Sequence, residues 1–550
     1  MKNKRHVLIL ILYLLGIFMG AIDTGIVSPA RELIENSFGV GRSTGTWMIT
    51  LYTLVYATSM PITSKMADRF GYKKVYLFGI GTFGLGSLLC GIANFTGGFW
   101  FFLLARGIQA LGGGGIMPIA NAEIGSSFPE EKRGTALGLV GMMYGMGNIL
   151  GPTLGSSILS IAGTTNWGWI FFINVPISIL IIALSIRLTN RKPEEQKPVD
   201  FAGALVLTGV VGSLLYALTN LDYFNFGESL LSVKVMPFLI IFLLLTPVLI
   251  LLEKKAVDPI LNLKYFSDPQ MLTTLIIAFF VGLGMMGMVF VPQFSENVLK
   301  IKAGTGGYLV TLLAVFSGIA APLSGRLIDK KGAKFVLLLG FLFNIAGSLV
   351  LGYGATYFLN FASVLAGLAL MGLGVGFTMG APLNYLVLKN VPAKESASGL
   401  AAMSLMRSMG LAVSPGLLVG FIVNGAKNSQ SKLMELFQTE FAASMPKGQS
   451  MSAMSFGDGS AFKALENADV TTIVSLLKEA MGKILPEKIS PMVLKMIDGI
   501  SDKIVKVFQD TLNTGYQHMY TAAAIIAFLG FAAALFLRER KTREKTDSTL

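Results

Sequence analysis

The stretch PEEKRGTALGLVGMMYGMGNILGP, residues 129–152, returns 263 positions later as PAKESASGLAAMSLMRSMGLAVSP, residues 392–415. Six residues are identical at this offset: Pro129, Leu137, Met143, Met146, Gly147 and Pro152 recur as Pro392, Leu400, Met406, Met409, Gly410 and Pro415. Both copies lie in apolar sequence, so the chain contains a duplicated unit. Duplication of this kind predicts two related halves in one membrane bundle.

Two short charged loops repeat at nearly the same offset. MADRFGYKK (residues 66–74) contains Asp68, and LIDKKGAK (residues 327–334) contains Asp329. Each loop carries one acid among several basic residues and a glycine. Taken alone, this composition is typical of any cytoplasmic turn of a membrane protein.

The composition indicates a membrane protein. The 550 residues are 53% hydrophobic and 14% charged, with a mean hydropathy of +0.66, whereas soluble proteins average roughly 25% charged residues. The single cysteine, Cys90, excludes an internal disulfide framework. His6 and His518 are far apart, so we expect no metal site.

Fourteen apolar runs are long enough to cross a bilayer, which takes about 20 residues. They cover residues 6–28, 45–63, 75–95, 99–121, 134–160, 167–187, 201–220, 234–252, 271–293, 305–325, 335–354, 358–385, 397–423 and 517–537. The fold expected is an all-α membrane protein with fourteen transmembrane helices, two six-helix bundles and two inserted helices. The expected domains are a six-helix bundle at 1–190, the inserted helices seven and eight with their linkers at 191–270, helices nine to thirteen at 271–423, an extracellular loop domain at 424–516, and helix fourteen with a tail at 517–550.

The distribution of Lys and Arg predicts the orientation. With the N-terminus inside, the short cytoplasmic segments carry 27 basic residues and the short external segments carry five. Both termini are therefore expected in the cytoplasm, and the net charge of +13 is explained without nucleic acid. The basic start followed by an apolar run resembles a signal peptide, but Asp23 inside the run and thirteen further spans favour an uncleaved first helix.

Residues 424–516 differ from the rest of the chain. They hold ten Lys and ten Asp or Glu, and apolar residues recur at helical spacing after Ser490-Pro491. A further amphipathic helix is expected at Asp469–Leu485. The segment is either a small helical hairpin packed on the external mouth or a cap that touches the substrate or a partner.

The second charged loop resembles the G-x-L-x-D-R/K-x-G-x-R/K loop of the major facilitator superfamily. The matching residues are Gly325, Leu327, Asp329, Lys330, Gly332 and Lys334. The first loop matches with Asp68, Arg69, Gly71, Lys73 and Lys74, but has Ser64 and Met66 where the family has Gly and Leu. The resemblance implies that these residues form a conformational gate.

Other motifs are similar to the fourteen-span drug:proton antiporter branch of that superfamily. They are Asp23-Thr24 with Ile26-Val27, Arg106-Gly107-Ile108-Gln109, Gly147-x-x-x-Gly151-Pro152-x-x-Gly155, Trp167–Pro176, and Asp258-Pro259-Ile260-Leu261. The resemblance covers the chain except 424–516. It implies a proton-coupled exporter and leaves the substrate open.

Ionisable groups inside spans are costly and are functional candidates by default. Asp23 and Arg106 fall at similar depth in the outer half, where they would either switch between an ion pair and a protonated acid or form a permanent salt bridge. Arg407 corresponds to Tyr144 under the repeat, and could bind an anionic group, a cavity water or a helix carbonyl. We place Gln109 and Asn148 with Tyr144 and Arg407 in the predicted substrate cavity.

Glycines and prolines in the repeated spans predict close helix packing and bends. We expect Gly147, Gly151, Pro152 and Pro415 to serve a shared hinge or seal, unless they are only the glycines and prolines common in membrane helices. Asn121 and Asn384 follow Pro118 and Pro382 at matching offsets and could line an inner gate.

The function expected is proton-coupled export of lipophilic small molecules across a bacterial-type plasma membrane by a monomer without cofactors. Export of a lipid or lipid-linked amphiphile is an alternative, motivated by 424–516. A non-transporting membrane sensor is a third, disfavoured by the retained loops and Asp23. The chain has no H-E-x-x-H, G-x-S-x-G or Walker motif, so we do not expect an enzyme or an ATP-driven pump.

Overall fold

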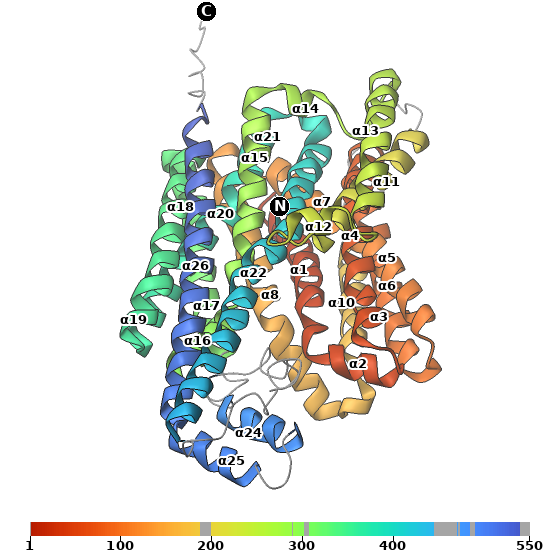
Figure 1. Cartoon of the computed structure of the whole chain (residues 1–550). Helices are drawn as coiled ribbons and strands as arrows, with labels where there is room; N and C mark the ends of the chain where they lie inside the picture. Colours follow the sequence, from red (N-terminus) through yellow and green to blue (C-terminus); the bar gives the residue numbers. More distant parts are fainter. Residues whose placement is uncertain are drawn as a thin grey trace, which may run out of the picture.

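The computed structural model describes residues 2–186, 200–288, 290–301, 307–444, 470, 473–484 and 490–538. Within these ranges the chain is helical, without a strand (Figure 1). In the part of the chain that the structure describes, ten helices are long and apolar enough to cross a membrane, and two shorter apolar helices accompany them. Each of the fourteen predicted runs falls on a helix or a pair of stacked helices, while the number that cross the bilayer stays a prediction.

The first half of the chain supplies six helical columns. They are α1 (Lys2–Ile26), α4 (Trp47–Phe70), α5 (Tyr72–Thr96), α6 with α7 (Phe99–Gly113, Ile116–Ser127), α8 (Glu130–Ala162), and α9 with α10 (Trp169–Phe172, Asn174–Ser185). Short helices α2 (Arg31–Ser37) and α3 (Arg42–Gly45) connect α1 to α4.

The second half repeats this arrangement. Its columns are α15 with α16 (Pro269–Gly284, Val291–Leu299), α17 (Gly307–Lys331), α18 with η4 and α19 (Ala333–Leu349, Val350–Ala355, Thr356–Phe358), α20 with α21 (Phe361–Met379, Ala381–Asn390), α22 (Ser396–Ser444) and α26 (Ser501–Leu535). Between the halves, α11 (Phe201–Asn220) and α13 (Met236–Lys255) form the inserted pair, which packs through α11 against α4 and α22.

The two charged loops form the same sharp turn. Gly71 separates α4 from α5 with φ of 96°, and Gly332 separates α17 from α18 with φ of 86°. Positive φ is readily accessible only to glycine. These two glycines therefore let each pair of helices reverse direction within one residue.

The halves meet along two seams. Helix α8 of the first half packs along α17 of the second, and α4 packs along α22. On the α8 seam, a Cβ added at Gly138 would lie 2.6 Å from the Ala321 carbonyl oxygen, and one at Gly325 would lie 2.3 Å from that of Gly134. The backbones touch here because neither helix carries a side chain at these positions.

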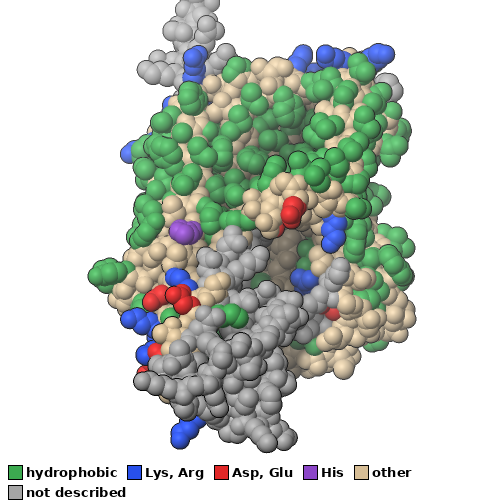
Figure 2. All heavy atoms as spheres, viewed as in Figure 1, with side chains coloured by type: hydrophobic (Ala, Val, Ile, Leu, Met, Phe, Trp, Pro, Cys, Tyr) green, Lys and Arg blue, Asp and Glu red, His purple; other side chains and the backbone are tan. Residues whose placement is uncertain are grey.

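The surface follows the expected membrane pattern. Figure 2 shows hydrophobic side chains over the middle of one face, with Lys and Arg gathered at the end that carries α14 (Lys264–Ser267). The charged loops at Gly71 and Gly332 lie at this end, which the charge pattern predicts to be cytoplasmic. Below, it is called the predicted cytoplasmic end, and the end that carries α24 and α25 is called the predicted external end (Figure 1).

The segment predicted as extracellular is built from extensions of two membrane helices. Helix α22 continues without a break from Ser396 to Ser444, and α26 begins at Ser501, so the expected boundaries at 423 and 516 lie inside helices. Two amphipathic helices, α24 (Ile473–Ile484) and α25 (Ser490–Gly499), pack beside them. Apolar residues of all four helices join Val291, Phe294 and Val298 of α16 in one core, which contains Leu433, Phe437, Ile473, Leu477, Ile497, Ile504 and Phe508.

Candidate functional site

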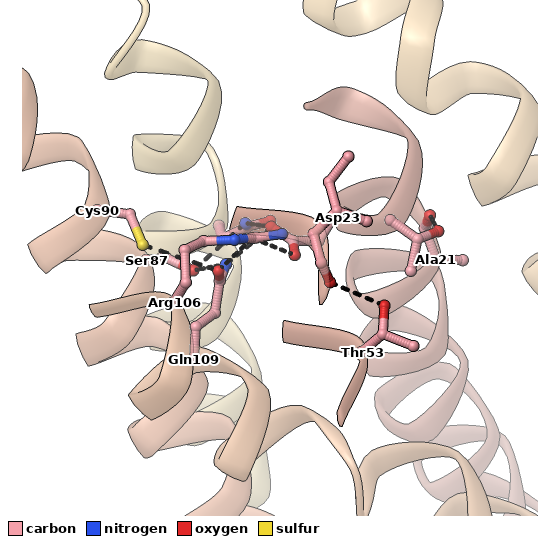
Figure 3. A network of polar contacts seen from close by, with 10 residues as sticks. Ala21, Asp23, Thr53, Ser87, Cys90, Arg106 and Gln109 are labelled. Atoms are coloured by element: carbon pink, nitrogen blue, oxygen red, sulfur yellow. Dashed lines mark hydrogen bonds and ion pairs between the residues drawn. The ribbon is translucent and has the colours of Figure 1, made fainter. Parts of the chain in front are cut away.

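A buried polar network lies inside the first half (Figure 3). Four helices supply it: α1 with Asp23, α5 with Ser87, α6 with Arg106 and Gln109, and α10 with Asn174. Arg106 is 3% exposed and the other four residues are fully buried. A cluster this dry is costly unless its members satisfy one another.

Asp23 accepts hydrogen bonds from three side chains. The Arg106 Nη1 lies 3.2 Å from Asp23 Oδ2, while Gln109 Nε2 and Asn174 Nδ2 lie 2.7 Å and 3.0 Å from Oδ1. The structure therefore brings together the acid and the base that the sequence placed at similar depth. In this conformation Asp23 is paired and shielded from water.

Arg106 is also held by neighbours other than Asp23. Its Nη1 donates to Gln109 Oε1 at 2.6 Å, and its guanidinium carbon lies 4.0 Å from the ring centroid of Tyr52. Such a cation–π contact stabilises a desolvated guanidinium by about 2 kcal/mol. Arg106 would therefore keep partners if Asp23 were protonated. A proton switch needs such partners for the arginine, whereas a permanent salt bridge does not.

Gln109 lies in this network rather than in an open cavity. Its side chain bridges Asp23, Arg106 and Ser87, with 2.8 Å between its Nε2 and Ser87 Oγ. We predicted Gln109 as a substrate-cavity residue, and that role stays a prediction; in this conformation its amide contacts both members of the ion pair. The Gln109 amide accepts from Arg106 through Oε1 and donates to Asp23 through Nε2, so one orientation of the amide satisfies both partners.

An aromatic pair on α4 connects the network to the centre of the molecule. Tyr52 stacks on Tyr56 with 5.8 Å between ring centroids. Tyr56 lies about one helical turn after Tyr52 on α4, the helix that packs along α22 at the seam.

Arg407 reaches from the second half into the first. It lies on α22, is 7% exposed, and its guanidinium carbon is 5.9 Å from the ring centroid of Tyr144 on α8. Its Nη2 donates to Met117 Sδ on α7 at 3.3 Å. Its Nη1 is buried and has no hydrogen-bond partner among the described residues.

Asn148 connects α8 to α1. Its Oδ1 accepts from Thr24 Oγ1 at 2.7 Å, and its Nδ2 donates to the Tyr144 carbonyl oxygen at 3.1 Å. Thr24 is exposed although it lies well inside the apolar stretch of α1. Asn148 and Tyr144 are half-buried, and their place in a substrate cavity stays a prediction.

The repeated aspartates cross the two seams at the predicted cytoplasmic end. Asp68 accepts from the backbone N–H of Ala397 and Ser398, at 3.0 and 2.8 Å, and from the Ser398 hydroxyl at 2.6 Å. Asp329 accepts in the same way from Gly134 N, Thr135 N and Thr135 Oγ1, at 3.0, 3.1 and 2.9 Å. Each carboxylate lies near the N-terminal end of a helix of the opposite half, where the helix dipole favours negative charge.

Asp68 differs from Asp329 in one partner. The Tyr72 hydroxyl donates to Asp68 Oδ1 at 3.0 Å. Burial raises the pKa of Asp68 to about 6, although its hydrogen bonds from Ser398, Ala397 and Tyr72 act in the opposite direction. Near neutral pH this carboxyl is therefore close to taking up a proton.

The remaining residues of the predicted gate lie close by. Arg69 has its guanidinium 5.1 Å from the ring of Phe70, and Lys330 is exposed in the last turn of α17. Asn384 Nδ2 donates to Asn121 Oδ1 at 3.1 Å across the halves, as their matching offsets suggested. A Cβ added at Gly141 would lie 2.7 Å from Gly380 Cα. The predicted cytoplasmic end is closed in this conformation.

The glycines of α8 face α1. A Cβ at Gly147 would lie 2.6 Å from Ala21 Cβ, and one at Gly151 would lie 2.8 Å from the Ile22 carbonyl oxygen. Pro152 contacts Gly25 on the same face, because a Cβ at Gly25 would lie 2.8 Å from Pro152 Cδ. The repeat is structural too: Gly410 of α22 faces Phe279 of α15, and Pro415 lies within α22.

Sequence reasoning missed a linker that bridges the halves. Lys65 of α4 forms an ion pair of 2.5 Å with Asp258, and Glu395 accepts from Asn262 Nδ2 and Tyr265 OH at 3.0 and 2.8 Å. Burial, and secondarily the nearby Glu395, raise the pKa of Tyr265 well above its ordinary value, so its hydroxyl stays a donor. The D-P-I-L motif was the sequence signal that could have located this linker. No motif marked Ser87 as a member of the buried polar network.

These features define a secondary transporter, and the chain belongs to the major facilitator superfamily, whose family model matches residues 13–415. It is therefore a transporter rather than an enzyme. The chain is 36% identical to the uncharacterized MFS-type transporter YfiU of Bacillus subtilis (strain 168), over 95% of each chain. It is 28% identical to the multidrug transporter protein MdtP of the same organism, over 99% of this chain and 95% of that one.

The fold is also that of solved family members. A crystal structure of the fucose:proton symporter FucP of E. coli matches with a TM-score of 0.53 at 15% identity, covering 77% of this chain and 93% of that one. Similarity at this level concerns the fold alone. The relationship to multidrug transporters agrees with the drug-efflux branch that the motifs resemble.

Proposed function

We propose that this protein exports lipophilic small molecules in exchange for protons, by alternating access of a central cavity to the two sides of the membrane. The observation that carries the proposal is the buried pair of Asp23 and Arg106, whose charged groups lie 3.2 Å apart. An ionisable pair inside a membrane bundle is a functional candidate by default, and Arg106 has contacts with Gln109 and Tyr52 that do not depend on the charge of Asp23.

Two further observations support alternating access. The closed contacts at the predicted cytoplasmic end are related by the repeat, with Asp68 and Asp329 in equivalent roles. Both are hydrogen bonds between halves, which can break as the halves rock. Moving one proton through 100 mV yields ~2.3 kcal/mol, roughly a fifty-fold concentration ratio.

The proposal includes a location and a state of assembly. We assign the protein to a bacterial-type plasma membrane as a monomer, with both termini in the cytoplasm and 424–516 outside. The apolar belt and the concentration of Lys and Arg at one end support this assignment (Figure 2).

Inverted membrane vesicles with an imposed pH gradient test the function. We expect fluorescent dyes to accumulate in the vesicles when the interior is acid, and accumulation to collapse when a protonophore dissipates the gradient. Vesicles with Asp23→Asn are the matched control. Accumulation that is indifferent to the gradient would contradict proton exchange.

A second candidate is export of a lipid or lipid-linked amphiphile. It is favoured by the segment formed by α24, α25 and the extensions of α22 and α26, which has an apolar core continuous with the second half. Scrambling of a fluorescent phospholipid in proteoliposomes distinguishes the two candidates, because a small-molecule exporter leaves the lipid where it is.

A further inference from the structure

Arg407 is a buried cation that forms no ion pair with any residue the structure describes. Its side chain is 7% exposed, and among the described residues no carboxylate lies within 4.0 Å of its guanidinium. Within the described ranges its two terminal nitrogens differ: Nη2 has only the thioether of Met117, a weak acceptor, and Nη1 has no hydrogen-bond partner. The nearest acid of the network, Asp23, is already paired with Arg106.

An unpaired buried charge is expensive. Desolvating an ion costs several kcal/mol, and the other buried arginine of the bundle recovers this through a carboxylate, an amide and two aromatic rings. Arg407 has one ring at 5.9 Å and one sulfur. The hydrogen-bond donors of the Arg407 guanidinium are therefore available to a ligand.

The position of Arg407 indicates what that ligand is. The guanidinium extends from α22 of the second half to Met117 and Tyr144 of the first. Aromatic rings and a flexible thioether accept apolar bodies of varied shape. A guanidinium accepts carboxylate, sulfonate or phosphate in a planar, two-bond geometry.

The site also lies at the point where access alternates. On one side, the Asn121–Asn384 hydrogen bond and the Gly141–Gly380 contact close the path toward the predicted cytoplasmic end. On the other side, Thr24 and Asn148 form an exposed polar pair. A ligand held by Arg407 would contact both halves, and so would be released when they rock.

We propose that Arg407 binds the negatively charged group of the transported molecule, so that the substrates of this exporter are amphiphilic organic anions. The inference rests on the proposed function and gives it a substrate class. An inside-negative potential drives an anion outward and a proton inward, so exchange of one anion for one proton moves two charges in the direction that the potential favours. This class therefore suits an exporter.

Selectivity between two dyes tests the site in inverted vesicles. The probes are the anion anilinonaphthalene sulfonate and the cation ethidium. We expect Arg407→Gln to lower the ratio of anion to cation export at least tenfold, and Arg407→Lys to restore part of it. Lys234→Gln is the matched control, because Lys234 is an exposed cation near the start of α13 and its removal changes the net charge equally.

Direct binding separates this inference from the proposed function. Purified protein in nanodiscs is dialysed against anilinonaphthalene sulfonate, with empty nanodiscs subtracted. We expect Arg407→Gln to weaken the Kd at least tenfold and Lys234→Gln to leave it within twofold. Size-exclusion profiles and melting temperatures verify that Arg407→Gln is folded, and Arg407→Met serves as a second variant.

The outcomes are distinct. If a pH gradient drives export of neither dye but Arg407→Gln weakens the Kd, the anion site is supported and proton-coupled export is contradicted. If both dyes are exported and Arg407→Gln changes neither the ratio nor the Kd, export stands and the anion site is overturned.

Discussion

At the scale of single residues, the first half concentrates charge where the second half does not. Asp23 and Arg106 neutralise each other in a dry network. Ser348, which corresponds to Ser87 at an offset of 261 residues, instead lines a cavity of about 30 Å³ with Asn344 and Met371. The two halves therefore share a scaffold, but only the first contains an ion pair at this place.

The first prediction concerns proton coupling. We expect Asp23→Asn to abolish gradient-driven export, because an amide cannot take up and release the proton. The substitution leaves Arg106 buried without its carboxylate, at a cost of about 3–5 kcal/mol. The double variant Asp23→Asn/Arg106→Gln removes both charges and should regain most of the lost melting temperature without regaining export. Undiminished gradient-driven export by Asp23→Asn would exclude this residue from the mechanism.

A second prediction uses the raised pKa of Asp68. In the closed conformation the pKa is about 6, against an ordinary value of 3.8 that we expect once the seam opens. The closed state therefore binds the proton more tightly. Protonation of Asp68 therefore stabilises the closed state. This stabilisation is complete below about pH 3.8 and is lost as the pH rises through about 6. Lowering the pH from 7.5 to 5 should reduce cysteine labelling at the predicted cytoplasmic end.

The variant Asp68→Asn distinguishes protonation from loss of the acceptor. A protonated carboxyl can donate a hydrogen bond to the Tyr72 hydroxyl oxygen, reversing the bond that the carboxylate accepts, and can still accept from both backbone N–H groups, whereas an Asn side chain places an NH₂ against one of them. We expect Asp68→Asn to increase labelling at pH 7.5, and to do so more than Asp329→Asn, which lacks the tyrosine partner. Equal or opposite shifts would contradict this asymmetry.

The residues of the site were only partly predictable. The depth of Asp23 and Arg106 in their spans was enough to expect them near each other, and the matched offsets of Asn121 and Asn384 indicated a gate. The neutral members were not predictable in the same way, because Ser87 carries no charge and lies in an ordinary apolar run. The buried position of Gln109 was missed, since which face of a helix points inward depends on packing.

At the scale of helices, close backbone contact stabilises the conformation. A Cβ at Gly151 would lie 2.8 Å from the Ile22 carbonyl oxygen and 3.1 Å from Gly25 Cα, both backbone atoms of α1. Backbone cannot rotate away as a side chain does. Helices α1 and α8 can therefore pack at this distance only because of glycine.

The third prediction tests this contact. Gly151→Ala forces α1 and α8 apart, which should cost about 1–3 kcal/mol and reduce export. The matched control is Gly81→Ala in α5, where an added Cβ meets no atom within 4 Å. Melting temperatures and dye export of both variants in the same vesicles are the measurements. Equal behaviour of the two variants would show that the α1–α8 distance is adjustable.

Hydropathy located the helices but not their ends. All fourteen apolar runs fall on helices, because a helix satisfies every backbone group within the chain. The continuation of α22 to Ser444 could not be predicted, since a polar sequence outside the membrane extends a helix without an apolar run. The regular spacing beyond Ser490 did indicate helix, although the structure divides it at Gly499 into α25 and α26.

At the scale of the whole molecule, the predicted external segment belongs to the second half. Its core includes α16, and Asn297 accepts a hydrogen bond from Val470 N and donates one to Tyr516 OH. Rocking of the two halves would therefore carry this segment along. It is outside the duplicated units, so the repeat does not require it for transport.

The last prediction concerns removal of this segment. Lys503 Nζ lies 2.5 Å from Glu440 Oε1, so α22 and α26 are neighbours there and a short Gly/Ser linker can replace 442–499. The shortened protein keeps Leu433, Phe437, Ile504 and Phe508 against α16, so we expect it to fold and to export dyes within about twofold of the intact chain.

Replacing 428–512 removes those four residues as well and exposes Val291, Phe294 and Val298, so this wider variant should melt at lower temperature. If the cargo is lipid-like, the shortened protein should lose it while retaining dye export. A shortened protein that is stable and transports nothing would place the segment within the transport cycle itself.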